Sequence, residues 1–163
     1  MPMKHIIQKN WITGSGEQID FYDLLNILKT HVSKGAKIFI GTDSFNSNSK
    51  TCFASAVCLH GGEMESRYFF FKDYKNKNRY SQLISRITEE TTRSINIANL
   101  LIKEYKFNLY NIELHLDISP KSKNEGTSKY SEMLSGYVQG YGLGFRLKPN
   151  AWASQSIADR HSK

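Results

Sequence analysis

The chain has 163 residues, of which 39% are hydrophobic and 12% aromatic. This length suffices for one domain with a substantial core, and no Pro/Gly/Ser-rich linker interrupts it, so we predict a single domain over 1–163 with 1–36 as an N-terminal extension. Because no apolar run is long enough to cross a bilayer and the first residues are polar, the sequence excludes a membrane span and a secretory signal and favours the cytoplasm. The formal net charge of +7 favours a polyanionic partner, such as nucleic acid, over an acidic protein or a neutral metabolite.

Residues 1–36 have little visible chemistry. Residues 1–16 are expected to be a lead-in in which Trp11 packs on the domain. Residues 20–32 have the apolar spacing of an amphipathic helix, with Asp20 as its N-cap. His31, near the end of this helix, is expected at the surface, where a helix C-terminus favours positive charge.

Two apolar runs with the same pattern organise the rest of the chain. Lys37–Phe45 (KIFIGTDSF) is predicted as a buried strand that carries Asp43, and Ile112–Ile118 (IELHLDI) is predicted as a strand that carries Asp117. IFIGTD aligns with IELHLD residue for residue, so parallel neighbouring strands would place both aspartates on one face at one height. Carboxylates so placed repel each other unless they share a proton or a divalent cation, which predicts a metal site.

The segment between these runs predicts further strands and a basic loop. Residues 51–60 and 65–72 are strand-like, and short turns would join them to the first strand as an antiparallel meander. Cysteines in the first of these runs are expected to be reduced core thiols. Residues 73–80 (DYKNKNRY) mix aromatic and basic side chains that could stack on a base and grip a phosphate backbone, namely Lys75, Lys77 and Arg79. A solvated polar loop is an equally good interpretation of this composition.

Residues 81–105 form the clearest predicted helix. Its apolar stripe should pass through or beside Glu90, whereas Glu89 should be solvated. A helix of this length would return the chain to a strand parallel to the first.

A glutamate on a buried helix face requires a compensating partner. A metal ion shared by Glu90 with Asp43 and Asp117 would provide it. The alternative is a helix-edge glutamate that is paired with Arg86 or Arg93.

The segments after Asp117 add further candidates. Residues 119–129 form a polar loop at the carboxyl end of a strand, where Lys121 and Lys123 are expected phosphate contacts. Residues 131–140 are predicted as a short helix with four inward residues: Met133, Leu134, Tyr137 and Val138. The last predicted strand, 145–148, ends at Lys148, a further candidate contact for nucleic acid.

The tail, 150–163, is helical in pattern and carries Asp159 as a candidate fourth carboxylate. The pattern alone favours the alternative, an ordinary surface acid in a fraying terminal turn. Arg160 would add positive charge for nucleic acid, and His161, whose ordinary pKa is about 6.5, could move protons. His115 is interpreted first as a core residue.

Several short motifs, in this order, resemble the YkuK-like family of predicted ribonuclease H-related nucleases over Lys37–Lys163. They are IGTDS, the helix pattern RI..E...S...A, HLDIS, KP and A..IADR..K. The resemblance implies an α/β ribonuclease H-like mixed sheet: a three-strand antiparallel meander, then strands parallel to the first, with flanking helices. It also implies that four acids bind two divalent ions and catalyse hydrolysis, here Asp43, Glu90, Asp117 and Asp159.

Carboxylate ligands suit Mg²⁺ or Mn²⁺, which would serve a two-metal hydrolysis of phosphodiester bonds. The expected activity is therefore a metal-dependent endonuclease acting on RNA in an RNA/DNA hybrid or structured duplex. Alternatives are a DNA junction endonuclease and a non-catalytic ribonuclease H-like module that binds nucleic acid. An actin-like phosphotransferase, and with it a nucleotide cofactor, is disfavoured because no Gly-rich phosphate loop follows Asp43.

Overall fold

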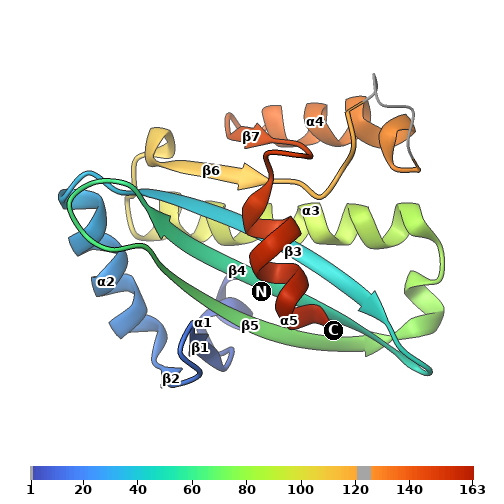
Figure 1. The fold of residues 1–163 in the computed structure, drawn as a ribbon, viewed down its shortest axis with the longest axis horizontal. Coiled ribbons are helices and arrows are strands. Elements are labelled where there is room, and N and C mark those ends of the chain that lie inside the picture. The colour runs from blue at the N-terminus through green and yellow to red at the C-terminus, as the bar shows by residue number, and fades with distance from the viewer. Residues whose placement is uncertain (1, 121–125) are drawn as a thin grey trace.

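The computed structural model describes residues 2–120 and 126–163 of the chain. Within them lies a seven-stranded sheet in the order β2-β1-β5-β4-β3-β6-β7 (Figure 1). Its strands are β1 (Trp11–Thr13), β2 (Gln18–Ile19), β3 (Lys37–Asn46), β4 (Lys50–His60), β5 (Arg67–Asn76), β6 (Ile112–His115) and β7 (Gly144–Arg146). The α-helices are α1 (Pro2–Ile7), α2 (Phe21–Ser33), α3 (Leu83–Asn99), α4 (Ser131–Gln139) and α5 (Asp159–Ser162). The π-helical segments η2 (Leu100–Glu104) and η6 (Ala153–Ala158) lie next to α3 and α5, and the 3-10 turns are η1 (Lys77–Tyr80), η3 (Leu109–Asn111) and η5 (Ser128–Tyr130).

The centre of the sheet has the predicted topology. β3, β4 and β5 form an antiparallel meander, and α3 then leads the chain back to β6, which pairs with β3 in parallel. The parallel register runs from Ile38 opposite Ile112 to Gly41 opposite His115, as the repeated sequence pattern predicted. β7 pairs in parallel with β6. The mixed α/β fold class is therefore confirmed.

Helices cover the two faces of the sheet. α2 and α3 lie on one face over the main hydrophobic core, and η6 with α5 crosses the other face (Figure 1). Because side chains alternate along a strand, Ile38, Ile40 and Thr42 face α3, whereas Phe39 and Asp43 face α5.

The segment η6 approaches β3 very closely. A Cβ atom built on Gly41 would lie 2.6 Å from the carbonyl carbon of Ala153, so only glycine fits at this crossing. On the same face, His115 is buried, and its Nδ1 accepts a hydrogen bond from the backbone N–H of Ala153 at 3.0 Å. His115 is therefore a core residue, as predicted, and its hydrogen bond holds the C-terminal segment on the sheet.

The N-terminal segment is more than a lead-in. β1 pairs antiparallel with β5, and the Trp11 side chain is 1% exposed, with its indole N–H donating to the carbonyl of Ile6 at 3.0 Å. The interpretation of 1–16 as a simple lead-in was wrong, although the packing of Trp11 was predicted. The division into one domain with an extension at 1–36 stays a prediction.

Three local predictions need correction. Residues 73–76 belong to β5 and not to a loop, because their backbone pairs with the start of β4 as far as Lys50 opposite Asn76. His31 is buried, and burial lowers its pKa, so it is not a surface residue. Met133 is 55% exposed, whereas Leu134 and Val138 of the same helix point into the core.

Two simpler expectations agree with the structure. Asp20 caps α2, because its carboxylate accepts a hydrogen bond from the backbone N–H of Tyr22. Cys52 and Cys58 are buried free thiols. No helix in the described part of the chain is long and apolar enough to cross a membrane.

Candidate functional site

Asp43 and Asp117 are brought together by the parallel register of β3 and β6. Asp43 is 7% exposed, and its Oδ2 accepts a hydrogen bond from the Ser162 hydroxyl at 2.9 Å. Burial is the main cause that raises the pKa of Asp43 to about 7, and the charge of Asp117 and contacts with the Asp117 and Asp159 side chains raise it further. Asp43 is therefore a buried carboxylate with two acidic neighbours.

Glu90 reaches the same place from α3. It is 8% exposed, and its Oε2 accepts a hydrogen bond from the Ser44 hydroxyl at 2.5 Å. Burial raises the pKa of Glu90 well above its ordinary value, and the charges of Asp43 and Asp117 act in the same direction. The opposing charge of Arg86 is a smaller effect. The prediction that Glu90 faces the buried side of the helix is confirmed.

Hydroxyl contacts fix the distance between α3 and β3. The Thr42 hydroxyl lies 2.9 Å from that of Ser55 on β4 and 2.9 Å from that of Ser94 on α3. All three side chains are buried. This buried chain of hydroxyls holds the helix that carries Glu90 against the strand that carries Asp43.

Lys148 lies beside Asp117. Its Nζ is 3.1 Å from Asp117 Oδ1, an ion pair without good hydrogen-bond geometry, and Oδ1 is a buried oxygen with no hydrogen-bond partner in the described residues. The backbone holds the two together, since the Lys148 N–H donates to the carbonyl of Ile118 at 3.0 Å. Lys148, the predicted phosphate contact, is therefore next to Asp117.

Asp159 comes from α5 and is the most exposed of the four acids. Its Oδ1 pairs with Lys163 Nζ at 2.8 Å, and its side chain also contacts Asp43. α5 packs on the sheet through η6, so Asp159 does not lie in a fraying turn. The four predicted acids therefore meet at one place, although their catalytic role stays a prediction.

The carboxylates, as they lie, do not form a ready metal cage. Within residues 2–120 and 126–163, no group of three or more His, Cys, Asp or Glu side chains is arranged to hold a metal ion. Instead, Ser162, Ser44, Lys148 and Lys163 each contact one of the four acids.

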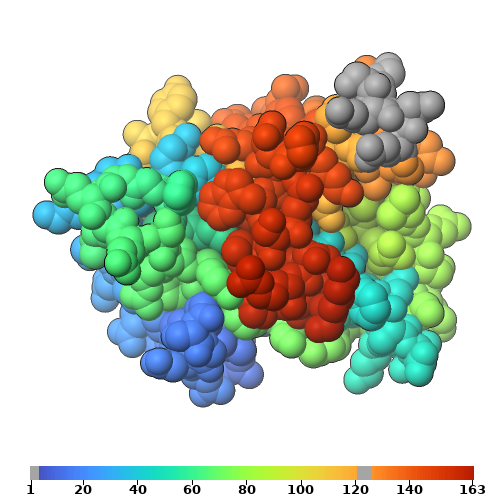
Figure 2. All heavy atoms as spheres, viewed as in Figure 1, coloured from blue at the N-terminus to red at the C-terminus, as the bar shows by residue number. Residues whose placement is uncertain are grey.

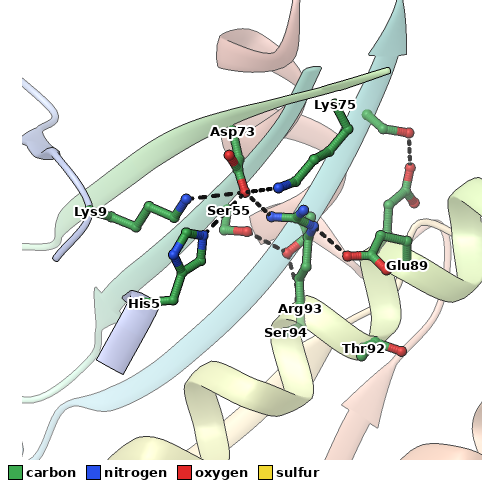
Figure 3. Close-up of polar contacts among 12 residues, drawn as sticks. His5, Lys9, Ser55, Asp73, Lys75, Glu89, Thr92, Arg93 and Ser94 are labelled. Atoms are coloured by element: carbon green, nitrogen blue, oxygen red, sulfur yellow. Dashed lines mark hydrogen bonds and ion pairs between the residues drawn. The ribbon is translucent and has the colours of Figure 1, made fainter. Parts of the chain in front are cut away.

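Lys75 has a different environment from the one predicted. On the α3 face of β5, Asp73 Oδ2 lies 3.2 Å from Lys9 Nζ, 3.8 Å from Lys75 Nζ and 2.9 Å from Arg93 Nη1 (Figure 3). Arg93 also pairs with Glu89 at 2.8 Å, so it is not the partner of Glu90. These groups border a cavity of about 270 Å³ between α1, β5 and α3. Lys75 therefore belongs to an ion-pair cluster on the sheet face opposite Asp43.

The other predicted contacts are scattered. Arg79 and Arg160 are exposed and Lys77 is half-buried, while Lys121 and Lys123 lie outside the described residues. Nucleic-acid binding by these five residues stays a prediction.

His161 is directed at β5. Its ring stacks on Phe70 with centroids 3.6 Å apart, and its Nε2 lies 3.0 Å from the Tyr68 hydroxyl. Burial lowers the pKa of His161, with a smaller effect of Arg160. The observed contacts give His161 a packing role, and proton transfer stays a prediction.

The sequence did not reveal the hydroxyl groups of the site. Ser44 and Ser162 donate to two of the acids. Ser44 directly follows Asp43, and Ser162 follows Asp159 by one helical turn, but serines at such positions are common and indicate no particular contact.

An antiparallel meander, a crossover helix, a fourth strand parallel to the first, and acids gathered between the central strands define a mixed α/β protein of the ribonuclease H type. A family model described as Ribonuclease H-like matches residues 21–163, and the chain belongs to this family. The resemblance seen in the motifs is thereby confirmed. Searches of curated proteins and of solved structures give no match. Family membership supports a nuclease-like or nucleic-acid-related function.

Proposed function

We propose that this protein is a divalent-metal-dependent nuclease that hydrolyses phosphodiester bonds, with RNA in an RNA/DNA hybrid or structured duplex as its substrate. One observation carries the proposal: Asp43, Glu90, Asp117 and Asp159, from four separate segments, interact at one place. A folded protein gains nothing in stability from such repulsion, which suits a site that binds cations.

The donor set fits Mg²⁺ or Mn²⁺. Carboxylate oxygens are the ligands that these hard ions prefer, and a cation would relieve the repulsion from Asp117 that contributes to the raised pKa of Asp43. The four acids would hold the metal ions. By analogy with the family, we expect two ions. When bound, such ions lower the pKa of an attacking water and stabilise the leaving oxygen.

The protein's own groups orient the site. Ser44 donates to one oxygen of Glu90, and Ser162 donates to one oxygen of Asp43, so each serine orients a carboxylate. Lys148 supplies a positive charge beside Asp117, where it would meet a phosphate oxygen.

Hydrolysis of end-labelled RNA/DNA hybrid, duplex RNA and four-way DNA junction tests the proposal, with Mg²⁺, Mn²⁺ or a chelator. We expect metal-dependent cleavage of the hybrid that Asp43→Asn abolishes and that Asp23→Asn, at an exposed acid of α2, leaves intact. Cleavage of the junction alone would redirect the substrate to DNA. No cleavage of any substrate by the wild type, or full activity of Asp43→Asn, would refute a nuclease.

A non-catalytic nucleic-acid-binding module is the second candidate. The observation in its favour is that every acid is already engaged by a serine or lysine, with no metal cage among the described residues. Tight binding of the hybrid in chelator, together with no hydrolysis in either metal, would select this function.

A further inference from the structure

The sheet face that carries Asp43 is only partly covered. β3, β4 and β5 run on beyond the end of α5 (Figure 1), and beside the C-terminal segment the β3–β4 end of the sheet, cyan in Figure 2, stays open. Phe45 lies two residues beyond Asp43 on β3, so both side chains are on this face. This uncovered surface therefore adjoins the acidic cluster.

Two aromatic side chains occupy this surface. Phe45 is opposite Cys52 on β4, and Cys52 is opposite Tyr74 on β5, so the three side chains form one row. Phe45 is 43% exposed and Tyr74 is 55% exposed. With neighbouring strands about 4.8 Å apart, the two aromatic residues are roughly 10 Å apart across the sheet. Two exposed rings therefore lie on either side of a small buried residue.

Positive charge borders the row on the same face. Lys72 lies two residues before Tyr74 and is in the row of Asp43 and Ala54, and Lys50 lies two residues before Cys52. Both lysines are exposed, and neither forms a salt bridge within the described residues. The aromatic platform, defined as Phe45, Cys52 and Tyr74 with the flanking Lys50 and Lys72, thus combines ring faces with unneutralised cations.

We propose that the aromatic platform binds a single-stranded segment of nucleic acid. Its bases would stack on Tyr74 and Phe45, and its phosphates would contact Lys50 and Lys72. Bases within a duplex are stacked on each other and cannot offer their faces to a sheet, whereas unpaired bases can. The proposal rests on the proposed function in that the substrate is a nucleic acid, and it specifies an unpaired segment next to the bond at the acidic cluster.

Fluorescence anisotropy with a labelled single-stranded oligonucleotide and a blunt duplex of the same sequence, both in chelator, tests the platform. For the double variant Phe45→Ala/Tyr74→Ala we expect single-strand affinity to fall at least about tenfold, because each stacked base contributes a factor of about 5–150. Duplex affinity should change less than about twofold. Leu109→Ala/Tyr110→Ala, two exposed residues directly before β6, is the matched control and should bind like the wild type.

Two further variants separate binding from folding. Tyr74→Trp keeps a stacking face and should retain single-strand affinity. Lys72→Ala should lower the slope of log K against log salt by about 0.7, the value of one phosphate contact on a single strand. Unchanged single-strand affinity of a folded double variant, or equal losses for strand and duplex, would overturn the platform. So would a concentration-dependent dimer in sedimentation that the double variant abolishes, since the occupant would then be a second copy of the chain.

The outcomes also separate this proposal from the nuclease. If the wild type hydrolyses the hybrid but strand binding is independent of Phe45 and Tyr74, the platform is wrong and the nuclease stands. If strand binding depends on these rings while no substrate is hydrolysed, the platform stands and the nuclease is wrong.

Discussion

Asp43 is the residue at which burial and charge act most clearly together. Its pKa is raised from 3.8 to about 7, first by burial and then by Asp117. Between pH 3.8 and about pH 7 the Asp43 carboxyl is ionised in the unfolded chain and protonated in the folded chain, so the folded state binds more protons. Stability contributed by this group is therefore fully present below pH 3.8 and is lost as the pH rises through about 7. Glu90, whose pKa is also raised by burial, acts in the same direction.

This sign gives a prediction for thermal melting in chelator. From pH 5 to pH 8 the wild type should lose stability relative to Asp43→Asn, and its Tm should fall. The corresponding loss in the free energy of unfolding is on the order of a few kcal/mol. Asparagine keeps an acceptor for the Ser162 hydroxyl but cannot ionise. Mn²⁺ should restore the wild-type Tm at pH 8 and have little effect on the variant. Parallel Tm profiles for the two proteins would show that Asp43 does not titrate in this range.

Lys148 is the second residue whose role can be isolated. Lys148→Gln removes the positive charge at 3.1 Å from Asp117 and keeps a polar side chain of similar length. If this charge meets the phosphate in the transition state, kcat should fall about 10- to 100-fold with little change in KM. Lys129→Gln, at an exposed lysine, is the control. A change confined to KM would assign Lys148 to ground-state binding.

At the scale of elements, the crossing of η6 over β3 positions Asp159. Gly41→Ala would place a methyl group 2.6 Å from the carbonyl carbon of Ala153, where backbone cannot yield easily. We expect a loss of about 1–3 kcal/mol or more in urea unfolding. Gly136→Ala, in the middle of α4 with nothing within 4 Å of the added atom, should instead stabilise by about 0.5–1 kcal/mol. Equal stability of the two variants would contradict the close approach.

Elements with a one-sided apolar pattern could be predicted from the sequence. The matching runs that end in Asp43 and Asp117 predicted the parallel register, and the stripe of α3 predicted the burial of Glu90. The end of β5 could not be predicted, because its sequence, DYKN, shows no alternation of apolar and polar residues. Strand pairing between β4 and β5 holds that segment instead, and pairing between distant residues leaves no local pattern.

In the site, the acids could be predicted from the sequence, but their hydroxyl partners could not. Carboxylates at strand ends and on a buried helix face stand out, because an isolated buried acid is costly. The contacts of Ser44 and Ser162 depend on how layers pack, which spacing does not reveal. For Asp159 the pattern favoured a frayed turn, since the anchor of its segment, His115, is remote in the sequence.

In the molecule as a whole, the N-terminal segment completes the sheet and core although the family match begins at residue 21. Trp11 packs edge-on against Phe71 of β5 at 4.7 Å between ring centroids. Trp11→Ala should therefore reduce the free energy of unfolding by about 3–5 kcal/mol, measured in urea. Met64→Ala, at an exposed side chain, should change it by less than about 0.5 kcal/mol. A small effect of Trp11→Ala would mean that 1–20 is dispensable for the fold.

The two helical layers bring acids to the same place from opposite faces of the sheet: Glu90 from α3 and Asp159 from α5, around Asp43 and Asp117 on neighbouring strands. Anomalous diffraction from crystals soaked in Mn²⁺ tests most directly whether this arrangement is a metal centre. We predict manganese peaks within coordinating distance of Asp43 and Asp117 that disappear in Asp43→Asn. Saturating Mn²⁺ that leaves these acids without an ordered ion, with Ser162 still bonded to Asp43 and Ser44 to Glu90, would contradict it.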